Sequence, residues 1–507
     1  MATGHADPAP RGRAALNGVL ATAAGLGAGH LVALVAPSSS PVAAVGARAI
    51  DLTPGPVKDW AVGTFGTADK TVLVVGAILV TLGLGALVGL VARRSMRAAL
   101  VCDIALTLLA LLAASAESAR ETLWILPGLA TLAVAWWTLV ALSRRAARVG
   151  PVSAPQGNGI ARRDWLRLVL AVSGVGLLGG ALGQVLRRGD GPQAIALPSR
   201  PVTPLPAGLE TQVPGLSPFV TPASTFYRID TALIIPSVDP ARWSLSIGGM
   251  VDHPFTIGWD ELLAMDAVER PVTLECVSNE VGGELIGSAR WLGVRTSELL
   301  KRAGVQPGAD MVLSTSVDNF TVSTPLAALL DERDALIVYE MNGAALLPEH
   351  GFPVRLLTPG LYGFVGATKW LVKMEVTTFA ARQAYWTTRG WSDHAPIKPS
   401  SRIEVPRDGA RVAHGPVKVG GTAWAPGVGV GRVQVRVDRG PWSDVTLGPD
   451  AGIEYWRQWL WSWDAAPGSH ELQVRVIDLD GRPQDQTVTG PVPNGASGLD
   501  AVTLTVG

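Results

Sequence analysis

The chain has 507 residues, of which 48% are hydrophobic and only 17% are charged, and its formal net charge is zero. This length predicts roughly three or four domains, and the shortage of charge indicates that part of the chain lies in lipid. A neutral chain has no global attraction for nucleic acid, which excludes nucleic acid as a partner. The two cysteines, Cys102 and Cys276, exclude a disulfide framework and a zinc ribbon.

Residues 1–190 are predicted to form an α-helical membrane domain. Apolar runs of about 20 residues suit a bilayer core of about 30 Å. About five spans are expected, at residues 14–36, 71–91, 98–114, 122–142 and 165–185. These runs carry no polar face, which favours membrane spans over a buried helical soluble domain.

The arginines predict the orientation of these spans. They cluster before the first span, between the second and third, and between the fourth and fifth, which is one side of a five-span topology. The positive-inside rule makes that side cytoplasmic. We therefore expect a multi-pass protein of the cytoplasmic membrane whose remaining domains lie on the extracytoplasmic side. Arg162 and Arg163 resemble a twin-arginine export signal, although an ordinary positive-inside anchor gives the same pattern.

After a proline-rich linker, residues 191–220, the pattern becomes that of a soluble α+β domain over residues 221–395. Strands are expected at residues 243–247, 271–274, 311–316, 335–339, 354–357 and 370–377, and helices at residues 259–265, 296–302 and 325–330. The sequence contains no dinucleotide-binding glycine motif, phosphate-binding loop or serine nucleophile elbow.

Residues 396–507 are predicted to form an immunoglobulin-like β-sandwich. Alternating segments at residues 417–424, 433–437, 471–477 and 501–506 are separated by glycine, proline and aspartate turns.

Cys276 is the residue on which the predicted active site is centred. It comes two residues after Leu274, the last apolar residue of a β-branched run that begins at Val272. Small polar residues and then Gly282 and Gly283 follow it, which predicts a loop at the end of a strand. A lone cysteine is often a small core residue. A cysteine presented by a polar loop instead suits a soft metal ion or nucleophilic chemistry.

Five motifs follow one another in the α+β region. They are Phe226-Tyr227-Arg228, Cys276-Val277-Ser278-Asn279, Ala289-Arg290-Trp291-Leu292-Gly293-Val294, His350-Gly351-Phe352-Pro353-Val354-Arg355 and Ala367-Thr368-Lys369-Trp370-Leu371. In this order they resemble the sulfite oxidase family of molybdopterin-dependent oxidoreductases, in a membrane-anchored bacterial form. The sandwich resembles the C-terminal dimerisation domain of that family, which is compatible with a homodimer.

The resemblance implies a molybdenum–molybdopterin cofactor whose metal is bound by Cys276, with Arg228 and Tyr227 as further catalytic residues. The cofactor site that it implies consists of Phe226, Tyr227, Arg228, Cys276, Ser278, Asn279, Asp318, His350, Arg355, Ala367, Thr368 and Lys369. Arg355 and Lys369 suit the anionic phosphate of the cofactor, and His350 is expected to donate to the pterin. Arg355 lies among apolar residues, where a buried arginine needs a partner.

The activity implied by the resemblance is oxygen-atom transfer on a small sulfur- or nitrogen-oxo substrate, with electrons exchanged with a separate carrier or a quinone-linked subunit. Glu280 and Val281 stand where sulfite-oxidising members carry an arginine pair, and Trp391 stands in place of a tyrosine. Added negative charge weakens the capture of a dianion, so we expect sulfite not to be the preferred substrate.

Three alternatives stay open. The first is a sulfite oxidase proper. The second is a non-enzymatic surface-binding protein on a degenerate cofactor fold. The third is a transporter with an accessory domain, although few polar residues occur in the predicted spans. His30 is the only histidine in a predicted span, so a bis-histidine haem is not expected there.

Overall fold

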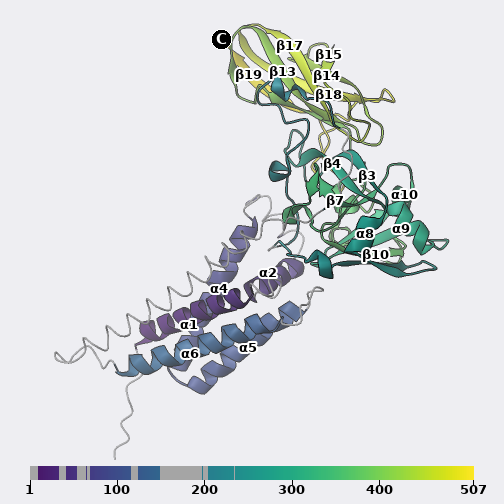
Figure 1. Cartoon of the computed structure of the whole chain (residues 1–507). Helices are drawn as coiled ribbons and strands as arrows, with labels where there is room; N and C mark the ends of the chain where they lie inside the picture. Colours follow the sequence, from purple (N-terminus) through teal and green to yellow (C-terminus); the bar gives the residue numbers. More distant parts are fainter. Residues whose placement is uncertain are drawn as a thin grey trace, which may run out of the picture. The chain divides into compact units, whose positions relative to one another are not determined.

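The computed structural model describes residues 10–33, 41–53, 57, 64, 69–115, 124–148, 197, 204–232 and 235–507. The chain divides into two compact units (Figure 1), one of Met1–Gln193 with Ala232–Ser237 and one of Ala194–Thr231 with Val238–Gly507. The first is helical and the second is rich in β-strands.

Among the described residues, four helices of the first unit are long and apolar enough to cross a membrane. The helices of this unit are α1 (Arg11–Val32), α2 (Pro41–Leu52), α4 (Asp69–Ala92), α5 (Met96–Ser115) and α6 (Leu126–Arg148). All but the short α2 coincide with the first four predicted spans. The predicted fifth span, residues 165–185, and the twin-arginine motif lie outside the described residues.

Small residues allow α1 to pack closely against α4 and α6. A Cβ atom added to Gly18 would meet the backbone of Gly85 and Gly89 in α4. A Cβ atom added to Gly25 would meet the backbone of Thr131 in α6. Helices in lipid gain little from the hydrophobic effect on association, so close backbone contact supplies the attraction between them.

In the second unit, the predicted catalytic region forms two five-stranded sheets. In the first sheet the order is β2-β1-β10-β5-β6, and in the second it is β3-β4-β7-β8, with β9 paired to β7. The strands are β1 (Ser244–Gly249), β2 (Phe255–Gly258), β3 (Ala267–Glu275), β4 (Ile286–Arg295), β5 (Met311–Ser316), β6 (Thr321–Pro325), β7 (Leu336–Met341), β8 (Ala344–Ala345), β9 (Arg355–Leu357) and β10 (Leu371–Thr377). Each strand predicted in this region overlaps one of them.

The helices of this region are α8 (Trp259–Ala264), α9 (Thr296–Ala303), α10 (Leu326–Leu330) and α11 (Gly363–Gly366). The first three agree with the predicted helices to within a residue at each end. Helix α9 buries Leu299, Leu300 and Ala303 on one face and ends at Gly304, whose φ of 69° is the left-handed conformation that glycine adopts without strain. Strand β7 is buried along its whole length, as its continuous apolar run indicates.

Residues 400–506 form two further sheets that pack over a shared apolar core containing Trp459 and Trp463. One has the order β11-β13-β17-β16 and the other β12-β19-β18-β14-β15. Their strands are β11 (Ser400–Val405), β12 (Arg411–Val412), β13 (Gly415–Trp424), β14 (Val430–Val437), β15 (Ser443–Asp444), β16 (Thr446–Leu447), β17 (Arg457–Ala465), β18 (Gly468–Asp478) and β19 (Ala501–Val506). The two-layer arrangement agrees with a sandwich, while the immunoglobulin-like topology stays a prediction.

The second half of the predicted linker is attached to this sandwich. The backbone N–H of Leu209 donates to Gln458 over 2.6 Å, and that of Ser217 donates to Glu404 over 2.6 Å. Phe219 is 1% exposed. Proline and glycine content alone suggested a spacer, but the apolar side chains between the prolines bury themselves against the sandwich.

Two glycines of α4 test the packing of the helical unit. In a helix, alanine is more favourable than glycine by about 1 kcal/mol at either position. The surroundings of the two glycines differ, however. A Cβ atom at Gly89 would meet the backbone of Ala14 and Gly18, whereas a Cβ atom at Gly83 would face open space. We expect Gly89→Ala to lower the melting temperature in detergent, since overpacking costs about 1–3 kcal/mol, and Gly83→Ala to leave it unchanged or raised. Equal melting temperatures for the two variants would contradict this packing.

Candidate active site

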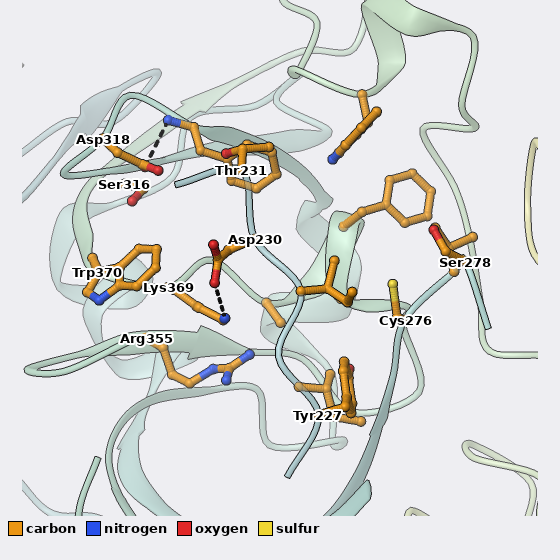
Figure 2. A pocket seen from close by; sticks show the side chains of 18 of the residues that line it. Tyr227, Asp230, Thr231, Cys276, Ser278, Ser316, Asp318, Arg355, Lys369 and Trp370 are labelled. Carbon is orange, nitrogen blue, oxygen red and sulfur yellow. Dashed lines mark hydrogen bonds and ion pairs between the residues drawn. The ribbon is translucent and has the colours of Figure 1, made fainter. Parts of the chain in front are cut away.

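One cavity of the second unit, about 910 Å³ including its open mouth, brings together segments that are far apart in the sequence. It is lined by Phe226, Tyr227, Ile229, Asp230, Thr231, Leu274, Cys276, Val277, Ser278, Ser316, Asp318, Phe320, Arg355, Gly363, Phe364, Ala367, Lys369, Trp370, Trp386 and Trp391. Figure 2 shows the side chains of Tyr227, Cys276, Asp230, Lys369 and Arg355 around this space.

Most of the site residues predicted from the sequence line this cavity. They are Phe226, Tyr227, Cys276, Ser278, Asp318, Arg355, Ala367 and Lys369. Four others do not line it. Asn279 is buried beneath the Cys276 loop, Thr368 is hydrogen-bonded to Ser314 over 2.6 Å, and His350 lies behind the cavity wall against Ala223. Arg228 is half-exposed and is held by Asp230.

Cys276 follows the last residue of β3, where the chain turns into the loop that leads to β4. Its backbone N–H donates to the carbonyl of Leu285 over 2.9 Å, and its own carbonyl accepts from the N–H of Asn279 over 2.9 Å. Desolvation raises the pKa of the thiol above its ordinary value, although hydrogen bonds from Ser278 oppose this. The thiolate is both the nucleophilic and the metal-binding form of cysteine, and a metal ion that binds the sulfur displaces its proton.

Arg355 is a buried cation, 3% exposed, at the start of β9. Its Nη1 donates to the carbonyl of His350 over 3.2 Å, and its Nε has no hydrogen-bond partner among the described residues. Burial lowers the pKa of Arg355 to about 10, so the guanidinium stays charged at neutral pH. A buried charge requires an opposite charge, and no ion pair of Arg355 with a carboxylate is recorded in the described part of the chain.

Lys369 already has an anionic partner. Its Nζ lies 3.1 Å from Oδ2 of Asp230, and the same oxygen lies 2.8 Å from Nε of Arg228. Burial lowers the pKa of Lys369 to about 8. Asp230 was missed in the sequence analysis, and the only signal for it was its place two residues after Arg228 in the first motif.

His350 is neutral, because burial lowers its pKa to about 4. Its Nε2 lies 2.6 Å from the carbonyl oxygen of Ala223, which can only accept, so Nε2 carries the proton. The other ring nitrogen, Nδ1, is then an acceptor, and it has no partner among the described residues. His350 can therefore accept a hydrogen bond at this atom, whereas the sequence analysis expected it to donate one.

The remaining lining is largely aromatic. The rings of Phe364 and Trp391 lie 5.7 Å apart and those of Trp386 and Trp391 lie 6.0 Å apart, and Phe320 adds a further ring. Asp318 lies in the same lining, where burial raises the pKa of its carboxyl. Glu280, by contrast, is exposed and does not line the cavity, so it is not placed to contact a substrate inside the cavity.

Comparison with known proteins places this region in a family. Residues 232–386 match a family model described as "Oxidoreductase molybdopterin binding domain". The chain is 32% identical over 153 residues to an uncharacterized oxidoreductase, YuiH, of Bacillus subtilis (strain 168), covering 30% of this chain and 74% of that protein. The chain belongs to the sulfite oxidase family of molybdopterin-dependent oxidoreductases.

Other members of the sulfite oxidase family match over a longer stretch. Mitochondrial sulfite oxidase of Mus musculus is 31% identical over 288 residues, covering 48% of this chain and 52% of that protein. Nitrate reductase [NADH] 1 of Oryza sativa subsp. japonica is 26% identical over 320 residues, covering 52% and 34%. The chain thus spans about half the length of the sulfite oxidases that it matches.

Among solved structures, the sulfane dehydrogenase SoxCD from Paracoccus pantotrophus is similar, with a TM-score of 0.50 and 21% identity. The likeness covers 63% of this chain and 89% of that chain. At this identity the likeness shows a shared fold.

The molybdenum–molybdopterin cofactor of the sulfite oxidase family fits the residues of this cavity. The cofactor carries a phosphate, polar ring atoms and a metal that takes sulfur ligands. The cavity offers the guanidinium of Arg355, whose Nε has no hydrogen-bond partner among the described residues, and the sulfur of Cys276. The cofactor would provide an anion for the first group and a metal for the second.

A substitution at Arg355 tests this fit without assaying turnover. We expect Arg355→Met to purify with pterin bound on the order of tenfold more weakly, because a charge-assisted hydrogen bond is lost, while the protein stays folded. Replacing a buried charge by an apolar side chain is often neutral for stability, and no carboxylate partner would be left behind. Pterin fluorescence and the melting temperature measure the two effects.

The matched control is Arg302→Met, which removes a surface ion pair with Glu261 and should leave pterin content unchanged. An Arg355→Met protein that retains pterin as the wild type does would contradict the fit.

Proposed function

We propose that this protein is a membrane-anchored enzyme that transfers an oxygen atom to or from a small sulfur- or nitrogen-oxo substrate outside the cytoplasmic membrane, with Cys276 as the protein ligand of molybdenum. The observation that carries the proposal is the meeting in one cavity of Cys276 and of Arg355, whose Nε has no hydrogen-bond partner among the described residues. We further propose residues 221–395 as the catalytic domain and residues 396–507 as an immunoglobulin-like, dimerisation-type domain, with residues 191–220 between these and the membrane domain.

The residues have distinct tasks in this proposal. Arg355 binds the phosphate of the cofactor, and Phe226, Ser278 and Ala367 shape the surface against which the pterin lies. The cofactor supplies the two-electron oxygen-atom transfer. Desolvation raises the pKa of Tyr227 well above its ordinary value, so its hydroxyl stays protonated and can donate to an oxygen of the substrate.

Arg228 has a different task from the one expected from the sequence. It does not line the cavity, and its guanidinium is hydrogen-bonded to both carboxylate oxygens of Asp230 at 2.8 and 3.3 Å. We assign it the role of orienting Asp230, which in turn fixes Lys369. Asn279 and Thr368 support the cavity wall in the same indirect way, through Glu275 and Ser314.

The cavity lining favours a substrate without a double negative charge. Of the two cations in the lining, Arg355 is assigned to the cofactor and Lys369 is paired with Asp230. The space that is left carries aromatic rings such as Trp386 and Trp391, and also Asp318, which the resemblance places in the cofactor site and which we assign instead to the substrate side. Aromatic faces bind uncharged organic groups, and a carboxylate repels sulfite.

The membrane helices and the extracytoplasmic placement belong to the proposal. The four apolar helices that the structure describes anchor the chain, and the arginine clusters set their orientation by the positive-inside rule. The extracytoplasmic placement also depends on the fifth span, which is predicted from the sequence at residues 165–185. Oxygen-atom transfer at the cofactor moves two electrons, which we assign to a separate carrier or to a quinone-linked subunit. A homodimer through the C-terminal sandwich agrees with the same proposal.

The ligand assignment is tested by metal and pterin analysis of the purified protein. We expect molybdenum and pterin in near-stoichiometric amounts in the wild type. In Cys276→Ser we expect an altered molybdenum(V) resonance and a loss of activity on the order of 100-fold or more, because a hard hydroxyl replaces a soft thiolate. Cys102→Ser, in helix α5, is the matched control and should behave as the wild type. Wild-type protein without metal or pterin would rule out the enzyme and leave a surface-binding protein.

The substrate assignment is tested by steady-state kinetics with sulfite and with uncharged sulfoxides and N-oxides, using a redox dye as the electron partner. We expect a higher kcat/KM for an uncharged substrate. Asp318→Asn should raise kcat/KM for sulfite on the order of tenfold relative to the uncharged substrate, because it removes a carboxylate near the substrate. Glu280→Gln should leave that ratio unchanged. Efficient, saturable oxidation of sulfite by the wild type would instead establish a sulfite oxidase proper.

A further inference from the structure

The carboxylate of Glu275, next to Cys276 in the sequence, joins two domains. It is buried, at 4% exposed. One oxygen accepts a hydrogen bond from the side-chain amide of Asn279 over 2.9 Å, and the other accepts from the indole N–H of Trp424 over 2.9 Å. Trp424 is the last residue of β13 in the C-terminal sandwich, 149 residues away in the sequence.

The side chain of Asn279 links Glu275 by hydrogen bonds to the loop that contains Cys276. While its Nδ2 donates to Glu275, its Oδ1 accepts the backbone N–H of Leu285 over 2.8 Å. The carbonyl of Leu285 in turn accepts the N–H of Cys276 over 2.9 Å. A continuous series of hydrogen bonds therefore runs from Trp424 through Glu275, Asn279 and Leu285 to the backbone of Cys276.

The sandwich holds the same loop at a second point. Nη1 of Arg402, in β11, donates to the carbonyl of Gly283 over 2.6 Å, and Arg402 is fixed by Glu404 at 2.7 Å. Gly282 faces the carboxyl group of Asp500 so closely that a Cβ atom would collide with it. The loop is thus attached to the sandwich on both sides of its turn, and its position depends on both domains.

We infer that Trp424 is a positioning residue for the Cys276 sulfur, acting through the Glu275 carboxylate. The inference rests on the proposed role of Cys276 as the metal ligand. Groups that hydrogen-bond to the surroundings of a ligand set its orientation and its basicity, and their removal changes metal affinity or activity by about 10- to 100-fold. The C-terminal sandwich then helps to hold the metal-binding loop in place, in addition to its proposed role in dimerisation.

A pair of tryptophans offers a matched test of this role. Trp424 and Trp456 are both 1% exposed, lie in the same apolar cluster and donate an indole N–H over 2.9 Å. Trp456 donates to the carbonyl of Phe219 instead of the Cys276 loop. Trp424→Phe and Trp456→Phe therefore each remove one buried hydrogen bond at a similar cost in stability, but only Trp424→Phe releases Glu275.

The experiment compares the molybdenum(V) resonance, the kcat and the KM of the two full-length variants with those of the wild type. For Trp424→Phe we expect a shifted resonance and a kcat on the order of tenfold lower with KM nearly unchanged; for Trp456→Phe we expect the wild-type resonance and kcat. An unchanged resonance in Trp424→Phe, or equal shifts in both variants, would overturn the inference.

A second variant covers the case in which Trp424→Phe does not fold. Glu275→Gln keeps the side-chain volume but places an amide N–H₂ opposite one of its two donors, so it should shift the resonance in the same way. Where both variants fold, the double variant should shift it no further than either single one, because both break the same connection.

Cys276→Ser separates this inference from the proposed function. An unchanged resonance in Cys276→Ser overturns the ligand assignment and the inference together, whereas a changed resonance in Cys276→Ser with none in Trp424→Phe and Glu275→Gln overturns only the inference.

Discussion

The burial of a positive charge that has no carboxylate partner among the described residues is the constraint on which the active site depends. Arg355 is held inside the second unit, and its Nε has no hydrogen-bond partner in the part of the chain that the structure describes. A bound anion would offset the cost of burying this charge. The neighbouring cation, Lys369, is already satisfied by Asp230. The cavity therefore distinguishes its two cations, since Lys369 is paired with an internal carboxylate and Arg355 has no carboxylate partner among the described residues. In the proposed function this difference assigns Arg355 to the cofactor phosphate and leaves the remaining space to the substrate.

The second organising feature is the loop after β3. A thiol beside a metal needs an orientation fixed to a fraction of an ångström, and loops are the least rigid parts of a fold. This loop gains rigidity from outside its own domain, from Trp424 and Arg402 of the sandwich. Strands β11 and β13 of the sandwich therefore take part in holding the loop that contains Cys276.

The site could be predicted from the sequence where residue type and local context were enough. Cys276 and Arg355 were singled out because a sulfur in a polar loop and a cation among apolar residues are chemically unusual, and Lys369 was singled out through its motif. Sequence order could not show whether a side chain lines the cavity or is buried behind the residues that line it. For this reason His350 and Asn279 proved to be buried supports, and Glu280, on which the substrate argument was based, proved to be exposed outside the cavity.

The sequence by itself determined the four apolar helices that the structure describes in the first unit, part of the strands and helices of the second unit, and the family, whereas strands such as β4 and β17 were not predicted. All of the predicted features depend on periodicity or on short motifs, which are local properties of the chain. Only the tertiary structure decided which distant groups meet, such as Asp230 with Lys369, 139 residues apart, and Glu275 with Trp424. A hydrogen bond or ion pair depends on the distance between atoms in space, and residues separated by a hundred positions carry no local signal of their contact.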